Sequence, residues 1–169
     1  KGPDFPTGGI IMGRAGIRAA YATGRGKVKV RARCTIEEND NGRSQIVITE
    51  IPYMVNKARL VESIANLVKD KRVEGISNIM DHSSREGMRI VIDIKRDANA
   101  QVVLNQLYNY TQLQDTCSMI LLALVPSPSN PDKVQPRVLT LREIIDYYID
   151  FQKDVVARRT RFDLAKAQA

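Results

Sequence analysis

The fold of this chain follows from a stretch that begins with Ser44-Gln45-Ile46-Val47-Ile48-Thr49-Glu50. This run predicts a β-strand, and Pro52 breaks it. A helix is expected next, over residues 55–69, because apolar side chains recur there at helical spacing. Its predicted apolar face consists of Val61, Ile64, Ala65 and Val68.

The stretch continues with a pair of strands at 76–81 and 88–94, which join around residues 85–87. A second amphipathic helix is expected at 98–110 and a buried strand at 117–125. The order strand-helix-strand-strand-helix-strand is that of the split βαβ, ferredoxin-like motif. We therefore predict an α+β fold with its helices on one face of a largely antiparallel sheet.

The flanking segments add elements on both sides of this motif. Upstream we expect a strand at 10–12, a helix at 15–22 closed by Gly24, and a strand at 27–38 that turns back through Asn39-Asp40-Asn41-Gly42. Downstream, residues 126–132 predict a loop without regular structure, followed by a short strand at 134–139. A long amphipathic helix starts at 141 and shows no stop signal, so we expect it to be truncated. The predicted division is an α+β domain at 1–140 and a helical arm at 141–169.

One strand carries an unusual pattern of charge. A basic residue stands at every second position from 25 to 33, and a strand would place these five cations on one face: Arg25, Lys27, Lys29, Arg31 and Arg33. Val28, Val30 and Ala32 would form the opposite, apolar face. No acidic residue occurs between Asp4 and Glu37, and the seven cations in that window equal the net charge of +7. The excess is therefore a local patch.

Such a row of like charges favours a polyanionic partner, and we predict backbone contacts to the phosphates of a duplex. The alternative is a solvated edge strand whose charges discourage aggregation. A nucleotide-binding loop is disfavoured, because Tyr21 and Val28 stand where that loop needs Gly and Ser or Thr. An RNA-recognition surface is also disfavoured, because its stacking aromatics are missing from this strand. A second group of cations, Arg158, Arg159 and Arg161, is equally consistent with an anion contact and with a solvated helix face.

The residues give no catalytic or metal centre. His82 is the only histidine, and Cys34 and Cys117 are the only cysteines, which we expect to be reduced thiols. No apolar run approaches the ~20 residues that a membrane-spanning helix needs. We therefore predict no catalytic residue, no metal and no membrane partner in this chain.

Several motifs, in order along the whole chain, resemble one family. They include Gly2-Pro3-Asp4-Phe5-Pro6-Thr7, Thr49-Glu50-Ile51-Pro52-Tyr53, Val55-Asn56-Lys57-Ala58-Arg59-Leu60 and Gly87-Met88-Arg89-Ile90-Val91-Ile92. The chain resembles the A subunits of bacterial DNA gyrase, a type IIA DNA topoisomerase. The paralogous subunit of topoisomerase IV is the close alternative. Departures from the family pattern are Met80-Asp81-His82-Ser83 and a longer loop at 126–136.

The resemblance implies a tower domain and the start of the coiled-coil arm. It implies that double-stranded DNA is the polyanion, with Arg25, Lys27, Lys29, Arg31 and Arg33 supporting the gate segment during ATP-dependent strand passage and supercoiling. The family's nucleophilic tyrosine follows an arginine, and none of the six tyrosines here does. Magnesium and ATP are expected on the partner B subunit of gyrase. The resemblance also implies a second A subunit in the full-length enzyme and a location in the bacterial cytoplasm, at the nucleoid. The rival interpretation is a structural spacer that positions the exit gate.

Overall fold

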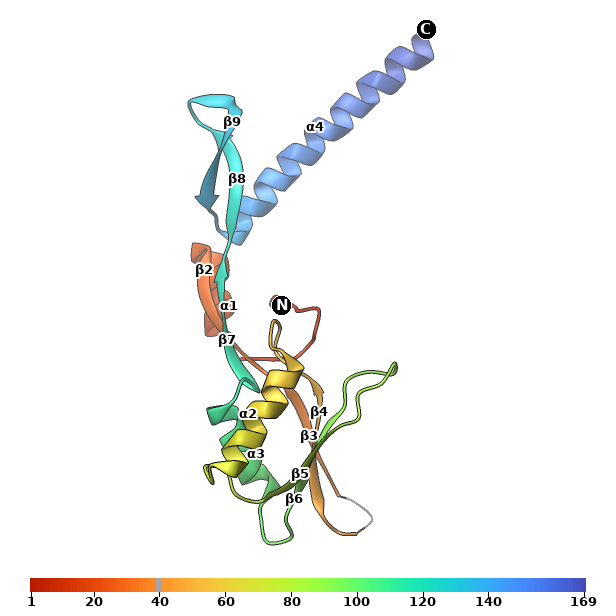
Figure 1. The fold of residues 1–169 in the computed structure, drawn as a ribbon. Coiled ribbons are helices and arrows are strands. Elements are labelled where there is room, and N and C mark those ends of the chain that lie inside the picture. The colour runs from red at the N-terminus through yellow and green to blue at the C-terminus, as the bar shows by residue number, and fades with distance from the viewer. Residues whose placement is uncertain (39–40) are drawn as a thin grey trace. The chain divides into compact units, whose positions relative to one another are not determined.

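The computed structural model describes residues 1–38 and 41–169 (Figure 1). Asn39 and Asp40 of the predicted hairpin turn therefore lie outside the described residues. The chain divides into two compact units. One consists of residues 1–13 and 28–117, and the other of residues 14–27 and 118–169.

The unit of residues 1–13 and 28–117 is built on a four-stranded antiparallel sheet. Its order is β3-β4-β6-β5, formed by β3 (Arg33–Glu38), β4 (Ser44–Glu50), β5 (Ile76–Asp81) and β6 (Ile90–Ile94). Ile46 and Ile48 of β4 stand opposite Ile92 and Ile90 of β6, and all four are fully buried. Two helices, α2 (Lys57–Lys69) and α3 (Ala100–Tyr110), cover one face of this sheet (Figure 1). The predicted α+β class is confirmed.

Both helices begin at an asparagine that caps their free N–H groups. Asn56 accepts a hydrogen bond from the Arg59 amide, and Asn99 accepts from the amides of Gln101 and Val102. The buried face of α2 is centred on Leu60, Ile64 and Leu67. Of the predicted face of α2, Ile64 is buried, and Val61 and Val68 are partly buried against the core. Only Ala65 is exposed, so the prediction was wrong at that residue alone. The buried residues of α3 are Ala100, Val103, Leu104 and Leu107.

The ferredoxin-like arrangement itself is not confirmed. In that motif the strand after the second helix joins the sheet beside the first strand. Here β3 occupies the place beside β4, and the chain after α3 forms β7 (Gln114–Ile120) in a different sheet of order β1-β2-β7. The other members of that sheet are β1 (Ile10–Met12) and β2 (Arg25–Arg31). The hairpin partner of β4 has displaced the fourth strand.

The unit of residues 14–27 and 118–169 contains two helices and a hairpin. α1 (Ala15–Thr23) ends at Gly24, whose φ of 76° is left-handed as the sequence predicts. β8 (Leu122–Ser127) pairs antiparallel with β9 (Asn130–Val138). The predicted loop at 126–132 was therefore wrong, because the backbone pairing continues to a short turn at Pro128 and Ser129.

The predicted buried strand at 117–125 was also wrong. The segment is divided between β7 and β8, and three of its apolar side chains are largely exposed: Ile120 (55%), Leu122 (62%) and Leu124 (68%). β8 belongs to a two-stranded sheet, and Leu122 and Leu124, which share one face of the strand, are exposed.

The chain closes with the predicted long helix, α4 (Leu141–Gln168). It starts in a capping box, in which Thr140 accepts from the Glu143 amide and Glu143 accepts from the Thr140 amide. None of its described residues is buried. Along the described residues, no helix combines the length and apolarity needed to cross a bilayer.

Candidate nucleic-acid interface

The basic segment is not one continuous strand. The predicted strand at 27–38 is two strands, β2 and β3, separated at Ala32. The Ala32 amide donates to the Leu113 carbonyl oxygen at 2.7 Å, and β2 and β3 belong to different sheets. The buried Ala32 is thus the point where the chain leaves one sheet for the other.

The predicted alternation of side chains is confirmed. Val28, Val30 and Ala32 are 2%, 3% and 0% exposed, whereas Arg25, Lys27, Lys29 and Arg33 are exposed and Arg31 is half-buried. A strand period of two explains this pattern directly. The five cations differ, however, in what each side chain contacts.

Arg33 is paired with a carboxylate. Its Nε lies 2.9 Å from Glu50 Oε1, in register with the β3–β4 pairing of the two residues. The Gly9 amide donates to the other carboxylate oxygen at 2.6 Å. The Gly9 amide and then Arg33 lower the pKa of Glu50, so the carboxylate stays charged. Arg33 is therefore largely neutralised and is a weak candidate for a phosphate contact.

Arg31 is held by neutral groups. Its Nε donates to Gln114 Oε1 at 2.6 Å, and its Cζ lies 4.7 Å from the centroid of the Tyr108 ring. The Tyr108 hydroxyl donates to the Ala32 carbonyl oxygen at 3.5 Å. Burial, followed by the neighbouring Cys34, raises the pKa of Tyr108, so the phenol stays protonated.

The side chains of Arg25, Lys27 and Lys29 make no hydrogen bond or ion pair with any described residue. Arg25 and Lys27 belong to the unit of 14–27 and 118–169, and Lys29 belongs to the other unit. Of the five predicted site residues, these three and Arg31 keep an uncompensated positive charge.

The two units differ strongly in charge. Residues 14–27 and 118–169 contain twelve Lys and Arg against six Asp and Glu, and the other unit contains fourteen against thirteen. Of the late cations in α4, Arg158 pairs with Asp154 at 2.8 Å, whereas Arg159 and Arg161 have no acidic partner among the described residues.

Tyr108 and Gln114 are contacts that sequence reasoning missed. Gln114 is 83 residues from Arg31 along the chain, so no local pattern signals this pair. Only the packing of α3 and β7 against the end of β2 brings the side chains together.

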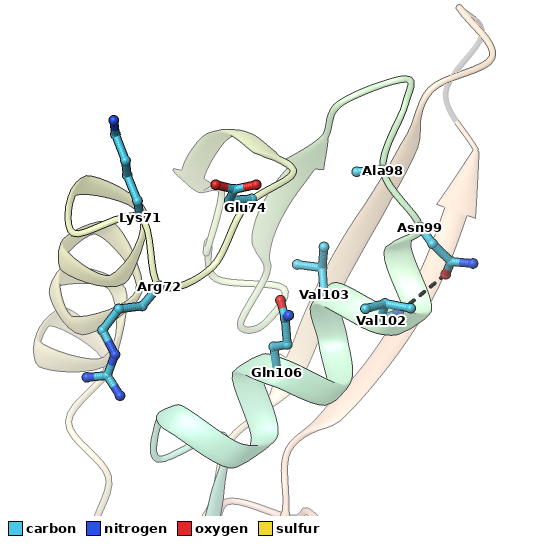
Figure 2. A pocket seen from close by; sticks show the side chains of 8 residues that line it. All are labelled: Lys71, Arg72, Glu74, Ala98, Asn99, Val102, Val103 and Gln106. Atoms are coloured by element: carbon cyan, nitrogen blue, oxygen red, sulfur yellow. Dashed lines mark hydrogen bonds between the residues drawn. The ribbon is translucent and has the colours of Figure 1, made fainter.

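A hollow of about 370 Å³ lies between the end of α2 and the start of α3 (Figure 2). It is lined by Lys71, Arg72, Glu74, Ala98, Asn99, Val102, Val103 and Gln106. Figure 2 shows the Lys71 and Arg72 side chains directed away from Val102 and Val103. Arg72 instead stacks on Tyr110, with Cζ 4.9 Å from the ring centroid. The hollow therefore does not present its cations to an anion.

The described residues contain no group of three His, Cys, Asp or Glu placed to hold a metal ion. Cys34 and Cys117 are free thiols, and burial raises the pKa of Cys34, which disfavours the reactive thiolate. His82 is exposed. What the described side chains offer is positive charge on an extended backbone, which suits binding to an anion.

Comparisons with known proteins find relatives along the whole chain. A model of the family formed by the A subunits of DNA gyrase and topoisomerase IV matches residues 1–169. The chain is 62% identical over 169 residues to the DNA gyrase A subunit from Clostridium acetobutylicum. It is 55% identical over 169 residues and 54% identical over 167 residues to the DNA gyrase A subunits from Fibrobacter succinogenes and Haemophilus influenzae. These matches cover 99–100% of this chain but only 18–20% of each relative, so the chain spans about a fifth of their length.

Proposed function

The chain belongs to the family of DNA gyrase and topoisomerase IV A subunits, and on that premise we propose that its basic strand binds the phosphate backbone of duplex DNA. One observation carries this proposal. Four cations, Arg25, Lys27, Lys29 and Arg31, occupy alternate positions of β2 and have no carboxylate partner among the described residues. From residue 28 on, the residues between them are buried and apolar. An uncompensated row of this kind is stabilised by an anionic ligand.

The wider role follows from the family. We propose that residues 1–140 are the tower domain of a gyrase A subunit, that the tower supports the gate DNA segment, and that α4 starts the coiled-coil arm. The exposed apolar side chains of α4, such as Tyr148, Phe151 and Phe162, suit a helix that gains a partner helix in the longer protein. Negative supercoiling, the B subunit of gyrase and a second A subunit belong to this proposal for the whole enzyme at the bacterial nucleoid.

Magnesium and ATP are assigned by this proposal to the B subunit. The described acidic residues of this chain do not fit a metal site, because no three potential ligands converge. None of the six tyrosines follows an arginine, as the nucleophilic tyrosine of the family does. The proposal therefore places no cleavage or resealing step on this chain and expects the chain alone to be inactive in both.

Two alternatives to this proposal differ in whether the chain binds DNA. The same region of a topoisomerase IV A subunit would bind DNA in the same way. A structural spacer, whose cations face acidic protein surfaces, would not bind DNA measurably.

Fluorescence anisotropy of the 169-residue chain with labelled duplex DNA tests the proposal. If each of the four uncompensated cations neutralises one phosphate, log K falls against log salt with a slope of about −3.6. Single-stranded RNA of equal length serves as the comparison and should bind more weakly, because this strand lacks aromatic side chains for base stacking. A duplex slope near zero would support the spacer and reject DNA binding.

A further inference from the structure

The guanidinium of Arg31 is fixed from two sides without losing its charge. Gln114 accepts a hydrogen bond from Nε at 2.6 Å, and the Tyr108 ring lies 4.7 Å from Cζ. Both partners are neutral. The two terminal nitrogens of Arg31 have no partner among the described residues. They form the planar fork that matches two oxygens of a phosphate.

The supports of Arg31 belong to the same compact unit as Arg31 and lie next to core residues. Tyr108 stands on α3, whose neighbouring Leu107 is fully buried in the core. Gln114 opens β7, directly after the buried Leu113, whose carbonyl accepts from Ala32. The two supporting side chains are therefore anchored next to core residues on either side of Arg31.

The other cations of the segment lack this arrangement. Lys27 and Lys29 are exposed and unsupported, so each must lose side-chain freedom when it binds. Arg33 is held too, but by the Glu50 carboxylate, which cancels its charge. The two lysines are not fixed and Arg33 is neutralised, so Arg31 is the one of these residues that combines a fixed guanidinium with an uncompensated charge.

We propose that Arg31 is a preorganised phosphate clamp and that Gln114 and Tyr108 are its positioning residues, which touch no DNA themselves. This inference rests on the proposed DNA-binding function. Preorganisation spares the ordering cost of one long side chain, which corresponds to about two- to tenfold in affinity.

The test uses the slope of log K against log salt for duplex binding. This slope distinguishes a residue that supplies a charge to the DNA from a residue that only positions such a charge. Arg31→Ala removes one phosphate contact, so the slope should become shallower by about 0.9. Gln114→Leu keeps every charge, so the slope should stay unchanged while affinity falls about two- to tenfold. Arg31→Lys should resemble Gln114→Leu, because lysine keeps the charge and loses the fork. Adding Gln114→Leu to Arg31→Lys should then cost nothing further.

Two further variants serve as a control and as a substitute for Gln114→Leu. Gln101→Leu is the matched control, because Gln101 is exposed on α3 and, among the described residues, its side chain bonds only to Asn105. Binding by this variant should equal wild type. If Gln114→Leu fails to fold, Gln114→Glu takes its place. It keeps the acceptor oxygen but pairs Arg31 with a carboxylate, so the slope should become shallower by about 0.9, as in Arg31→Ala.

Each outcome decides between the proposals. Wild-type affinity in Gln114→Leu, or an equal loss when that change is added to Arg31→Ala, overturns the clamp and leaves DNA binding intact. If the wild-type chain shows no salt-dependent binding, the proposed function fails and the clamp fails with it.

Discussion

At the residue scale, the contacts of each side chain decide what a row of cations can do. Arg33 and Arg31 lie two positions apart, yet the first faces the Glu50 carboxylate and the second faces Gln114 and Tyr108. The alternation of buried and exposed residues could be predicted from the sequence, because it depends only on the period of a strand. The partners of Arg31 and Arg33 could not, because pairing across strands and helices supplies them.

A titrating pair on the same unit gives a prediction about pH. Lys57 Nζ lies 2.7 Å from Asp81 Oδ2, and Ser83 donates to the same carboxylate, so the pKa of Asp81 falls to about 2 from its usual 3.8. A lowered folded-state pKa stabilises the fold above the unfolded value, and this contribution disappears as the pH falls towards the folded value. Asp81→Asn should therefore destabilise the protein near neutral pH, and the difference from wild type should narrow between about pH 5 and pH 2.

The size of this effect is small, because 36% and 39% of the two side chains are exposed. We expect Asp81→Asn to lower the free energy of unfolding by less than about 1 kcal/mol, as measured by urea denaturation at about pH 6. Lys57→Met is the companion variant. In the Lys57→Met background, the effect of Asp81→Asn on the free energy of unfolding should change much less with pH. A difference that stays constant across this pH range would show that the pair contributes nothing.

At the element scale, the end of α1 depends on one glycine. Gly24 adopts a φ of 76°, donates to the Ala20 carbonyl oxygen and lies against Leu139 and Val138. A Cβ at this position would collide with the Leu139 carbonyl oxygen and crowd Val138 Cγ1 at 2.6 Å. The sequence signal for this cap was strong, because helices commonly end at a left-handed glycine.

Gly24→Ala should therefore lower the free energy of unfolding by about 2–4 kcal/mol, since backbone strain and overpacking combine. Urea denaturation followed by circular dichroism measures it. Gly13→Ala is the matched control, because Gly13 also has a positive φ of 81° but its Cβ would meet nothing within 4 Å. If Gly24→Ala and Gly13→Ala lowered the free energy of unfolding equally, the close approach of Gly24 to Leu139 would contribute nothing to the effect.

The hairpin β8–β9 shows where element prediction failed. An apolar run such as 119–125 predicts a buried strand only if a second layer covers it. In the two-stranded sheet Leu122 and Leu124 remain 62% and 68% exposed. Likewise, the order of elements predicted a ferredoxin-like sheet, but β3 already occupied the edge beside β4. Strand order in space depends on such competition, which the order along the chain does not record.

At the scale of the whole molecule, charge and apolar surface point to partners outside this chain. The unit of 14–27 and 118–169 carries twelve basic against six acidic residues. Its long helix α4 exposes Tyr148, Phe151 and Phe162 and has no buried residue among those described. Both features agree with the proposed DNA contact and coiled-coil arm of a chain that spans about a fifth of its relatives' length.

The central claim is that cations of β2 bind the DNA backbone, and charge reversal on the strand tests it most directly. The measurement compares salt-dependent duplex affinity of the wild-type chain with Lys27→Glu/Lys29→Glu. The control is Lys69→Glu/Lys95→Glu, which makes the same charge change at two exposed lysines without ion pairs among the described residues.

If the strand binds phosphates, the Lys27→Glu/Lys29→Glu chain loses two contacts. Its slope should then become shallower by about 1.8, and its affinity near 0.1 M salt should fall roughly 60-fold. The control should stay within about threefold of wild type, because distant surface charges are screened at this ionic strength. Equal losses in the two double variants, or none in Lys27→Glu/Lys29→Glu, would contradict the account.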